Sequence, residues 1–392
     1  MGLTKESVWE ILKRDSVAIY SEDGLKEKLF SGKPMKIKLG CDPSRPDLHL
    51  GHSVVLRKLR MLQELGHEII FIIGDFTGMV GDPSGKTKTR PPLTFEETRE
   101  NGESYFQQVT KILDKDKTRI CYNSEWLSDM NFADVLKLCG KYTVARILER
   151  DDFSKRLEEN RPIGMHELLY PLMQGYDSVA LACDVEVGGS DQTFNLLVGR
   201  ELMRDYDLPP QEVITFPLLP GLDGVEKMSK SLDNYIGINE PPEVIFEKCM
   251  KVPDQLLETY FRLTTDIDME QVKPMLEKDI REAHFAYGEA IVKLYWGEEA
   301  VEDAKARYTT IAAGAAPEVM PEYKLPAGSY PLWKLVSLTE LADTTSDARR
   351  LIKQGGVSFD GVAHKDPVME IECTGEMLIK RGKSAFAKAI FA

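Results

Sequence analysis

The sequence predicts an α/β protein with a parallel sheet, followed by a helical region and a small α+β domain. A predicted strand at residues 36–41 and a continuous apolar run at 68–76 flank a stretch of helical period, which is the pattern of a βαβ unit. Residues 242–313 read as helices. Residues 331–392 hold nine Lys/Arg and eight Asp/Glu, a charge of about +1, so the remaining 330 residues carry −15 of the chain's net −14. A chain of 392 residues has room for two or three such domains.

The first βαβ unit begins with the strand KIKLGC (36–41) and the turn DPSRPD. The helix HLGHSVVLRKLRMLQELG has apolar residues near helical spacing and should end at Gly66. The strand EIIFIIGDF (68–76) is a continuous apolar run, as in a parallel sheet that is covered on both faces. We expect the crossover between the two strands to be right-handed.

The remaining elements follow in order along the chain. Residues 94–114 and 130–159 look helical, and residues 166–182 form an amphipathic helix. A short strand and a glycine-rich turn, DVEVGGSDQ, lead into the helix FNLLVGRELMRDY. The polar loop EKMSKSLDN precedes the helical region. The stretch 312–331, rich in Ala, Gly and Pro, is the predicted linker to the C-terminal domain.

The composition excludes several classes of protein. A net charge of −14 argues against a protein that covers nucleic acid or membrane with its whole surface, so any such contact must be a local patch. Six scattered cysteines without a C-x-x-C pair indicate reduced thiols rather than disulfides or a zinc ribbon. No apolar run reaches about 20 residues and the N-terminus is acidic as well as basic, so we expect a cytoplasmic protein.

Two histidines, His49 and His52, lie at the start of the first helix in the string HLGH. They could share a helical face and bind a metal, although no third ligand is nearby, or they could be a structural pair. A helix N-terminus also offers unpaired N–H groups and a positive dipole, so imidazole donors beside Gly51 suit a triphosphate. The order strand, glycine, helix is consistent with nucleotide binding, but HLGH alone is a weak signal.

A second string, KMSKS at 227–231, places Lys227 and Lys230 on a polar loop. Alone it could be a solvated basic loop. Two lysines with hydroxyl neighbours can also hold a departing pyrophosphate, because such contacts strengthen as charge develops. The two strings flank Rossmann-like elements and together resemble the HIGH and KMSKS signatures of class I aminoacyl-tRNA synthetases.

Three polar residues on one helix, Tyr170, Gln174 and Asp177, have spacings of four and three and therefore face the same way. They predict a lined pocket, with a polar surface stripe as the alternative. Asp191 and Gln192 stand on the turn GGSDQ, which by itself could be only a tight turn. In combination these strings resemble bacterial tyrosyl-tRNA synthetases, from about residue 30 to the end of the chain.

The resemblance implies a role for each matching residue. Asp177 receives the substrate hydroxyl. Tyr170, Gln174 and Asp82 bind the ammonium group, and Gln192 lies near the carboxylate. The implied tyrosine site comprises Gly40, Asp82, Tyr170, Gln174, Asp177 and Gln192. The implied ATP site, in which Asp191 holds the ribose, comprises Asp42, Ser44, His49, Gly51, His52, Gly189, Asp191, Gln192 and Lys230.

The string GDPSGKT at 81–87 is one residue too short between its glycines for a P-loop and is instead similar to the family's GDPSGK loop. The resemblance turns Asp82 toward the amino acid and makes Lys86 and Arg90 basic residues that meet pyrophosphate in the transition state. The alternative is that these residues, with Lys88, form a solvated charge run. The implied catalytic residues are His49, His52, Lys86, Arg90, Lys227 and Lys230.

One position departs from the family's pattern. Many bacterial members place a tyrosine four residues before the aspartate of the DP turn, where its hydroxyl meets the substrate phenol. Lys38 occupies that position here. Phenol binding therefore depends more heavily on Asp177, and the second contact to the hydroxyl stays unassigned.

The resemblance implies tyrosine–tRNA ligase activity in two steps. The carboxylate of L-tyrosine attacks the α-phosphorus of ATP to give tyrosyl-adenylate and pyrophosphate, and the 3′ end of the cognate tRNA(Tyr) then takes the tyrosyl group. The nucleophile needs no activation, so the protein positions groups and stabilises charge. Mg²⁺ should arrive with ATP rather than in a tight protein metal site. The alternatives are a tryptophanyl-tRNA synthetase, a non-catalytic synthetase-derived RNA-binding regulator and a generic nucleotidylyltransferase.

The C-terminal sequence from Pro331 resembles the small RNA-binding domain first seen in a ribosomal small-subunit protein. Basic residues on a helix and an adjacent turn suit the phosphate backbone of structured RNA, with a nearly neutral surface as the alternative. These residues are Arg349, Arg350, Lys353, Lys380, Arg381 and Lys383.

We therefore expect three domains. They are a Rossmann-like catalytic domain at 1–226 with an inserted dimerisation segment, the KMSKS loop with an α-helical anticodon-side domain at 227–320, and the RNA-binding domain at 331–392. The family is homodimeric. Apolar residues within 121–160 could form the dimer contact or belong to the core, namely Trp126, Leu127, Phe132, Val135 and Leu138.

Overall fold

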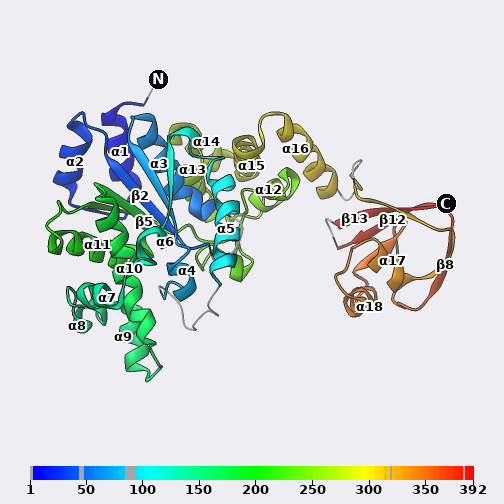
Figure 1. The fold of residues 1–392 in the computed structure, drawn as a ribbon. Coiled ribbons are helices and arrows are strands. Elements are labelled where there is room, and N and C mark those ends of the chain that lie inside the picture. Colours follow the sequence, from blue (N-terminus) through cyan, green and yellow to red (C-terminus); the bar gives the residue numbers. More distant parts are fainter. Residues whose placement is uncertain (1–2, 44–47, 84–93, 314, 318–319, 383–384) are drawn as a thin grey trace. The chain divides into compact units, whose positions relative to one another are not determined.

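Figure 1 shows the computed structural model of the chain, which describes all residues except 1–2, 44–47, 84–93, 314, 318–319 and 383–384. The described chain divides into two compact units. The first comprises residues 1–241 and 248–295, and the second comprises residues 242–247 and 296–392. The division into three domains at 226 and 331 stays a prediction.

The first unit is built on a six-stranded sheet in the order β1-β6-β5-β2-β3-β4. Its strands are β1 (Ala18–Tyr20), β2 (Lys36–Cys41), β3 (Glu68–Ile73), β4 (Thr118–Tyr122), β5 (Val185–Gly189) and β6 (Glu212–Phe216). All neighbours are parallel except β1 and β6, which confirms the predicted parallel sheet. The strand order reverses between β2 and β5, and ligands of such sheets bind beyond the carboxyl ends of the strands at that point.

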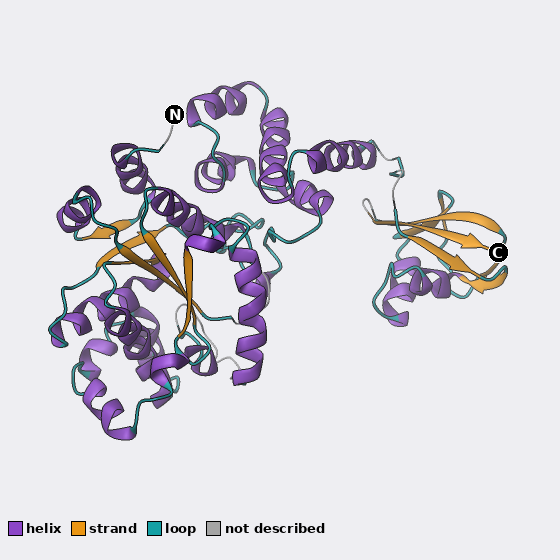
Figure 2. Cartoon of the chain, turned by 45° about the horizontal axis from the view of Figure 1, so that its top comes forward, coloured by secondary structure: helices purple, strands orange, loops and turns teal. Residues whose placement is uncertain are grey.

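Helices surround this sheet, as Figure 2 shows. Those that precede the fifth strand are α1 (Lys5–Asp15), α2 (Glu22–Phe30), α3 (Leu50–Glu64), α4 (Thr77–Val80), α5 (Phe95–Val109), α6 (Ser124–Leu127), α7 (Phe132–Cys139), α8 (Val144–Ile147), α9 (Asp151–Glu158) and α10 (Met165–Leu181). The helices of the first unit that follow the fifth strand are α11 (Thr193–Asp205), α13 (Leu257–Thr264), α14 (Met269–Lys278) and α15 (Ile280–Trp296). Helix α12 (Pro242–Cys249) belongs mostly to the second unit. Short 3₁₀ turns lie at 115–117, 190–192, 230–232 and 254–256. Among the described residues, none of the helices has the length and apolarity that crossing a bilayer requires.

The predicted βαβ unit is present. Gly66 ends the turn after α3 with a φ of 91°, a left-handed backbone that glycine adopts without a steric penalty. The following strand, β3, stops three residues earlier than predicted. Its chain already turns at Gly74, whose N–H donates to the carbonyl of Cys41 at the end of β2.

The helical stretch predicted for 130–159 is three short helices rather than a longer one. Asn131 caps α7 by accepting hydrogen bonds from the backbone N–H groups of Ala133 and Asp134. Thr143 caps α8 by accepting from the N–H of Arg146. Each cap satisfies helix N–H groups and starts a new helix. The helical spacing of apolar residues therefore continues through the segment although the helix itself is interrupted.

The second unit contains the end of the chain. A five-stranded sheet has the order β10-β9-β12-β13-β7, and β11 pairs with β8. Its elements after α16 (Glu299–Ala312) are β7 (Glu322–Leu325), β8 (Gly328–Pro331), α17 (Leu332–Leu338), α18 (Thr345–Lys353), β9 (Val357–Phe359), β10 (Val362–Ala363), β11 (Glu370–Cys373), β12 (Gly375–Arg381) and β13 (Ala385–Phe391). The buried faces of α17 and α18 share one apolar core with these strands.

The linker predicted for 312–331 is wrong in its second half. Strand β7 runs parallel to β13, with Glu322 opposite Lys388, and Tyr323 and Leu325 pack against the core of this domain. Strand β8 also lies within the predicted linker. The short period-two pattern of β7 is hard to recognise among so many Ala, Gly and Pro residues.

Candidate active site

Two imidazoles cap the helix that begins beyond the carboxyl end of β2. His49 is the N-cap of α3, and its Nδ1 accepts the backbone N–H of Gly51 at 3.2 Å. The N–H of His49 in turn donates to Nδ1 of His52 at 3.2 Å, and the ring centroids are 4.0 Å apart. Because each Nδ1 is an acceptor, the neutral rings carry their proton on Nε2. Both rings therefore hold an N–H donor for a ligand.

Both imidazoles are held neutral. Burial lowers the pKa of His52 to about 4, with the nearby Lys230 acting in the same direction. Burial also lowers the pKa of His49 far below its usual value, and His52 and Lys230 add to this effect. At neutral pH the pair is therefore a neutral hydrogen-bond donor beside the positive end of a helix.

The KMSKS loop lies against this helix start although it is distant in sequence. The N–H of Leu50 donates to the carbonyl of Ile236 at 3.0 Å, and the N–H of Ile238 donates to that of Leu48 at 3.1 Å. A Cβ on Gly51 would lie 3.6 Å from Cβ of Met228, inside the loop. The main chain thus joins the two strings.

The lysines of the loop face the same region. Lys227 Nζ is 2.7 Å from a carboxylate oxygen of Asp191, which lies on the turn after β5, the strand that ends at Gly189. Lys230 acts electrostatically on His49, His52 and the thiol of Cys41 at the end of β2. The predicted phosphate-side residues of the described chain are therefore gathered at the point where the strand order reverses.

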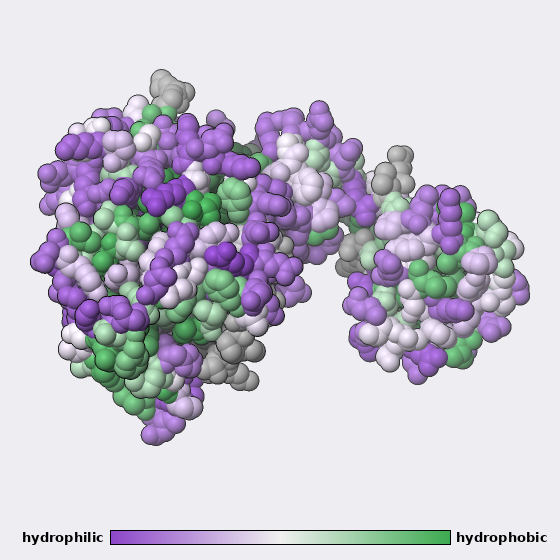
Figure 3. Space-filling model, viewed as in Figure 1, coloured by the Kyte–Doolittle hydropathy of each residue, from purple (hydrophilic) through white to green (hydrophobic). Residues whose placement is uncertain are grey.

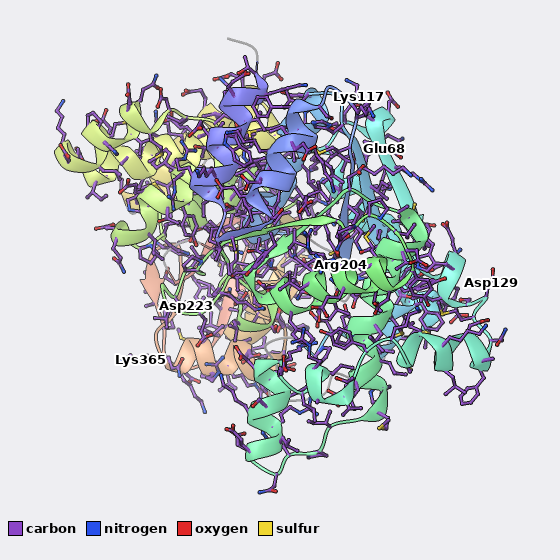
Figure 4. The ribbon with its side chains drawn as sticks, turned by 90° about the vertical axis from the view of Figure 1, so that its left-hand side faces the viewer. Glu68, Lys117, Asp129, Arg204, Asp223 and Lys365 are labelled. Carbon is purple, nitrogen blue, oxygen red and sulfur yellow. The ribbon has the colours of Figure 1, made fainter. Side chains whose placement is uncertain are left out.

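Asn234 holds the loop in shape, and sequence reasoning missed it. Its Oδ1 accepts the N–H of Ser229 at 2.7 Å, and its amide donates to the carbonyl of Lys227 at 3.3 Å and to Asp223. Asp223, labelled in Figure 4, also accepts the backbone N–H groups of Val225 and Glu226. The only sequence signal was the polar character of the segment.

Asp177 is buried beneath the sheet's carboxyl edge, with 3% of its surface exposed. The indole N–H of Trp126 donates to its Oδ1 at 2.8 Å. Burial raises the pKa of Asp177 to about 7, while Lys38, Trp126 and Asn123 oppose that rise and Glu186 adds to it. Sequence reasoning treated Trp126 only as apolar and did not assign it to the site.

Tyr170 and Asp42, predicted for different parts of the substrate, touch each other. The Tyr170 hydroxyl donates to Asp42 Oδ2 at 2.8 Å. Asp42 Oδ1 accepts from the Thr77 hydroxyl at 2.7 Å. Gln174 lies one turn before Asp177 on α10 and is partly exposed. A Cβ on Gly40, in β2, would meet no atom within 4 Å, so space is open above this strand.

Asp82 is joined to Gln192 and to an arginine that sequence reasoning missed. Gln192 Nε2 donates to Asp82 Oδ2 at 2.8 Å, and Arg150 lies 3.5 Å from Asp82 Oδ1. Arg150 is 5% exposed and also pairs with Asp152 at 2.7 Å. Its position between two helices of the insertion carries no recognisable motif.

Three predicted residues of this site, Ser44, Lys86 and Arg90, lie outside the described residues, as does Lys88. Where the structure describes the chain, no group of three or more His, Cys, Asp or Glu side chains is arranged to hold a metal ion.

In the second unit, the predicted RNA-binding residues gather at one end of the C-terminal domain. Arg349, Arg350 and Lys353 line a surface hollow on α18 with Ser346 and Gln354. The N–H of Gly382, which follows Lys380 and Arg381, donates to the carbonyl of Gly356 shortly after α18. Arg381 also donates to the Leu341 carbonyl at 2.8 Å. Lys383 lies outside the described residues.

Comparison with known proteins gives one consistent result. A family model described as tRNA synthetases class I (W and Y) matches residues 31–312. A tyrosine–tRNA ligase from Deinococcus radiodurans is 49% identical over 392 residues, covering 97% of this chain and 95% of its own. One from Moorella thermoacetica is 48% identical, covering 96% of this chain and 94% of its own.

Solved structures agree on the fold. A C-terminally truncated mitochondrial tyrosyl-tRNA synthetase from Aspergillus nidulans has a TM-score of 0.64 at 23% identity, covering 78% of this chain and 94% of its own. A tyrosyl-tRNA synthetase from Archaeoglobus fulgidus, complexed with L-tyrosine, has a TM-score of 0.61 at 24% identity, covering 78% of this chain and 99% of its own.

Proposed function

The chain belongs to the tyrosine–tRNA ligases among the class I aminoacyl-tRNA synthetases, and we propose that its reaction occurs beyond the carboxyl ends of β2 and β5. It activates L-tyrosine with ATP to tyrosyl-adenylate and pyrophosphate, and it then transfers tyrosine to the 3′ end of a tRNA. The observation that carries the location is the backbone pairing of the HLGH helix start with the segment after KMSKS.

On the phosphate side, His49 and His52 donate their Nε2 protons to phosphate oxygens of ATP. Lys227 and Lys230 neutralise the pyrophosphate as it departs, together with Lys86 and Arg90. Neutral donors and cations suit this task, because they stabilise charge that grows in the transition state. Asp42, Ser44, Gly51 and Gly189 complete the ATP site, and Asp191 receives the ribose. The salt bridge between Lys227 and Asp191 must open for both roles to be filled.

On the amino-acid side, Asp177 accepts the phenol hydroxyl of tyrosine. Tyr170, Gln174 and Asp82 bind the ammonium group, and Gln192 lies near the carboxylate. The hydrogen bond between Gln192 and Asp82 supports this neighbourhood, since the two groups of an amino acid are attached to one carbon. Gly40 leaves room for the substrate against β2.

Mg²⁺ enters as part of the ATP substrate, held by phosphate oxygens and water. The protein's own groups then supply hydrogen bonds and positive charge rather than a metal cage. We also assign the enzyme to the cytoplasm, because protein synthesis, which consumes the charged tRNA, takes place there.

The tRNA partner is tRNA(Tyr), and the C-terminal domain binds its phosphate backbone. Arg349, Arg350, Lys353, Lys380, Arg381 and Lys383 form this contact. Support comes from the hollow on α18 and from the main-chain bond that brings the end of β12 beside it. Cations in one patch release counterions from RNA, which makes such binding salt-dependent.

A homodimer is the expected assembly, and exposed apolar residues of the insertion suit its contact. Phe132 is 77% and Leu136 57% exposed, and Val144, Leu157 and Met165 are also exposed. Figure 3 shows hydrophobic surface over α7, α8 and α9. Of the residues first considered for this contact, Leu127 and Leu138 are buried in the monomer, so the contact is assigned to Phe132 and its exposed neighbours.

Amino-acid-dependent exchange of pyrophosphate into ATP tests the proposal. Tyrosine should support exchange, whereas tryptophan and phenylalanine should not. Exchange with tryptophan would indicate the other member of the W and Y family. Exchange with none of them, alongside intact tRNA binding, would indicate a regulator that has lost catalysis.

A further inference from the structure

The floor of the amino-acid pocket contains a buried ion pair that the mechanism above does not use. Lys38 is 1% exposed, and its Nζ lies 3.1 Å from Glu186 Oε1. It also donates to the backbone carbonyl of Gln174 at 3.2 Å. Lys38 on β2 and Glu186 on β5 are direct partners in the sheet register. The pair therefore lies on the sheet face that α10 covers.

Glu186 is held rigidly in this pair. Its Oε2 accepts from the Ser178 hydroxyl at 3.2 Å and from Gln211 Nε2 at 2.5 Å. Ser178 is the neighbour of Asp177 on α10. The lysine thus lies between the Glu186 carboxylate, whose Oε1 faces it, and the helix that carries Asp177.

Asp177 lies on α10 one turn after Gln174, the residue whose carbonyl accepts from Lys38. Asp177 and Glu186 both raise the pKa of Lys38 against the effect of its burial, so the ammonium stays charged. Gly40, two residues along β2, faces the same way as Lys38 and leaves open space. The lysine therefore shares a face of β2 with the open space at Gly40, where the proposed function places the substrate.

Stability does not explain the pair. Apolar residues of similar volume can replace a buried ion pair at little cost, or with a gain. Apolar residues at both positions 38 and 186 would extend the core formed nearby by Ile70, Ile72 and Leu181, whereas one such replacement alone would leave a buried charge unpaired. A charge at this place instead acts on what binds above it.

We propose that Lys38 and Glu186 are positioning residues that keep Asp177 ionised and aimed as the acceptor for the substrate's phenol hydroxyl. This proposal rests on the proposed function, in which Asp177 receives that hydroxyl. The Lys38 ammonium stabilises the ionised carboxylate of Asp177, and the negative charge of Glu186 partly offsets this stabilisation. Lys38 thereby contributes to the selection of tyrosine over phenylalanine without touching the substrate.

The two residues should shift the acidic limb of tyrosine binding in opposite directions. The titratable groups around Asp177 are Lys38 on β2, Glu186 on β5 and Tyr170 on α10. Lys38→Met removes the cation, so Asp177 should ionise only at higher pH. Glu186→Gln removes an anion, so Asp177 should ionise at lower pH. General damage to the fold would move both variants the same way.

Pyrophosphate exchange by the full-length enzyme between pH 6 and 9 measures how the KM for tyrosine depends on pH in each variant. For Lys38→Met we expect the KM for tyrosine at pH 7 to rise about tenfold, to recover toward pH 9, and to change more than kcat. The preference for tyrosine over phenylalanine should fall by a similar factor. Lys38→Arg, which keeps the charge, should restore much of both.

Unchanged pH profiles and unchanged discrimination in both Lys38→Met and Glu186→Gln would overturn the proposal. If Lys38→Met does not fold, a shift of the Glu186→Gln profile to higher pH, or no shift, would overturn it. Asp177→Asn separates this failure from that of the proposed function. An Asp177→Asn enzyme that still binds tyrosine normally would refute the role of Asp177 itself.

Discussion

The amino-acid end and the phosphate end of the proposed site are built in opposite ways. At the amino-acid end, burial leaves a carboxylate, Asp177, with a pKa of about 7 and tight neighbours. At the phosphate end, burial makes His49 and His52 neutral donors, while Lys227 remains 44% exposed on its side chain. At the first end the key charge is buried, and at the second end a cation stays in contact with water.

The difference follows from the task of each end. Rejection of a substrate that lacks one hydroxyl requires a buried polar group that pays a desolvation cost when left unpaired. Stabilisation of a leaving pyrophosphate requires charges that can follow it. Substitutions at the two ends should therefore fail differently, the first in specificity and the second in rate.

The largest effect is expected for Asp177→Ala. Without the buried carboxylate the pocket no longer penalises phenylalanine, so the ratio of kcat/KM for tyrosine to that for phenylalanine should fall by about 10³ or more. Pyrophosphate exchange with each amino acid measures the ratio. Asp129→Ala, at an exposed aspartate, is the control. Retained discrimination would mean that another group reads the hydroxyl.

Lys230→Ala should fail in rate instead. Loss of a cation that acts in the transition state is expected to slow adenylate formation about 10²- to 10³-fold, while the equilibrium affinity for tyrosine is nearly kept. Single-turnover formation of the adenylate and equilibrium dialysis of tyrosine separate the two. Lys278→Ala on α14 serves as the control. Normal activation by the Lys230 variant would remove the loop from the mechanism.

Only some of this site was predictable from sequence. HLGH, GDPSGKT and KMSKS are compact strings, and a regular period outlined β2, α3 and β3. Trp126 and Arg150 meet their partners across 51 and 68 residues. Those contacts depend on how the insertion folds back on α10, which no local pattern encodes. The same limit applies to the insertion itself, where caps at Asn131 and Thr143 divided a continuous apolar period.

The proposed RNA-binding surface of the second unit differs from both ends of the active site, because its contribution is electrostatic and the expected effect of mutation is smaller. Replacing Arg349 and Lys353 by alanine should weaken tRNA binding about tenfold and reduce its salt dependence by roughly two counterions. Adenylate formation should be unaffected, because these residues belong to the other compact unit. Filter binding at several salt concentrations measures the effect. Lys324→Ala, on the exposed face of β7, is the control, and an unchanged salt slope would exclude α18 from the tRNA contact.

The smallest expected effect is on stability, and its sign depends on pH. Burial raises the pKa of Asp177 from the ordinary 3.8 to about 7. Between these values the folded chain holds a proton that the unfolded chain releases, so this stabilising contribution is lost as the pH rises through 7. Relative to Asp177→Asn, the wild type should lose about 2 kcal/mol of unfolding free energy between pH 5 and pH 8. Thermal melts of both proteins at the two pH values give the comparison. Equal shifts in the two melting temperatures would mean that Asp177 is ionised at both pH values and bears no cost of burial, which would remove the physical basis of the contrast between the two ends.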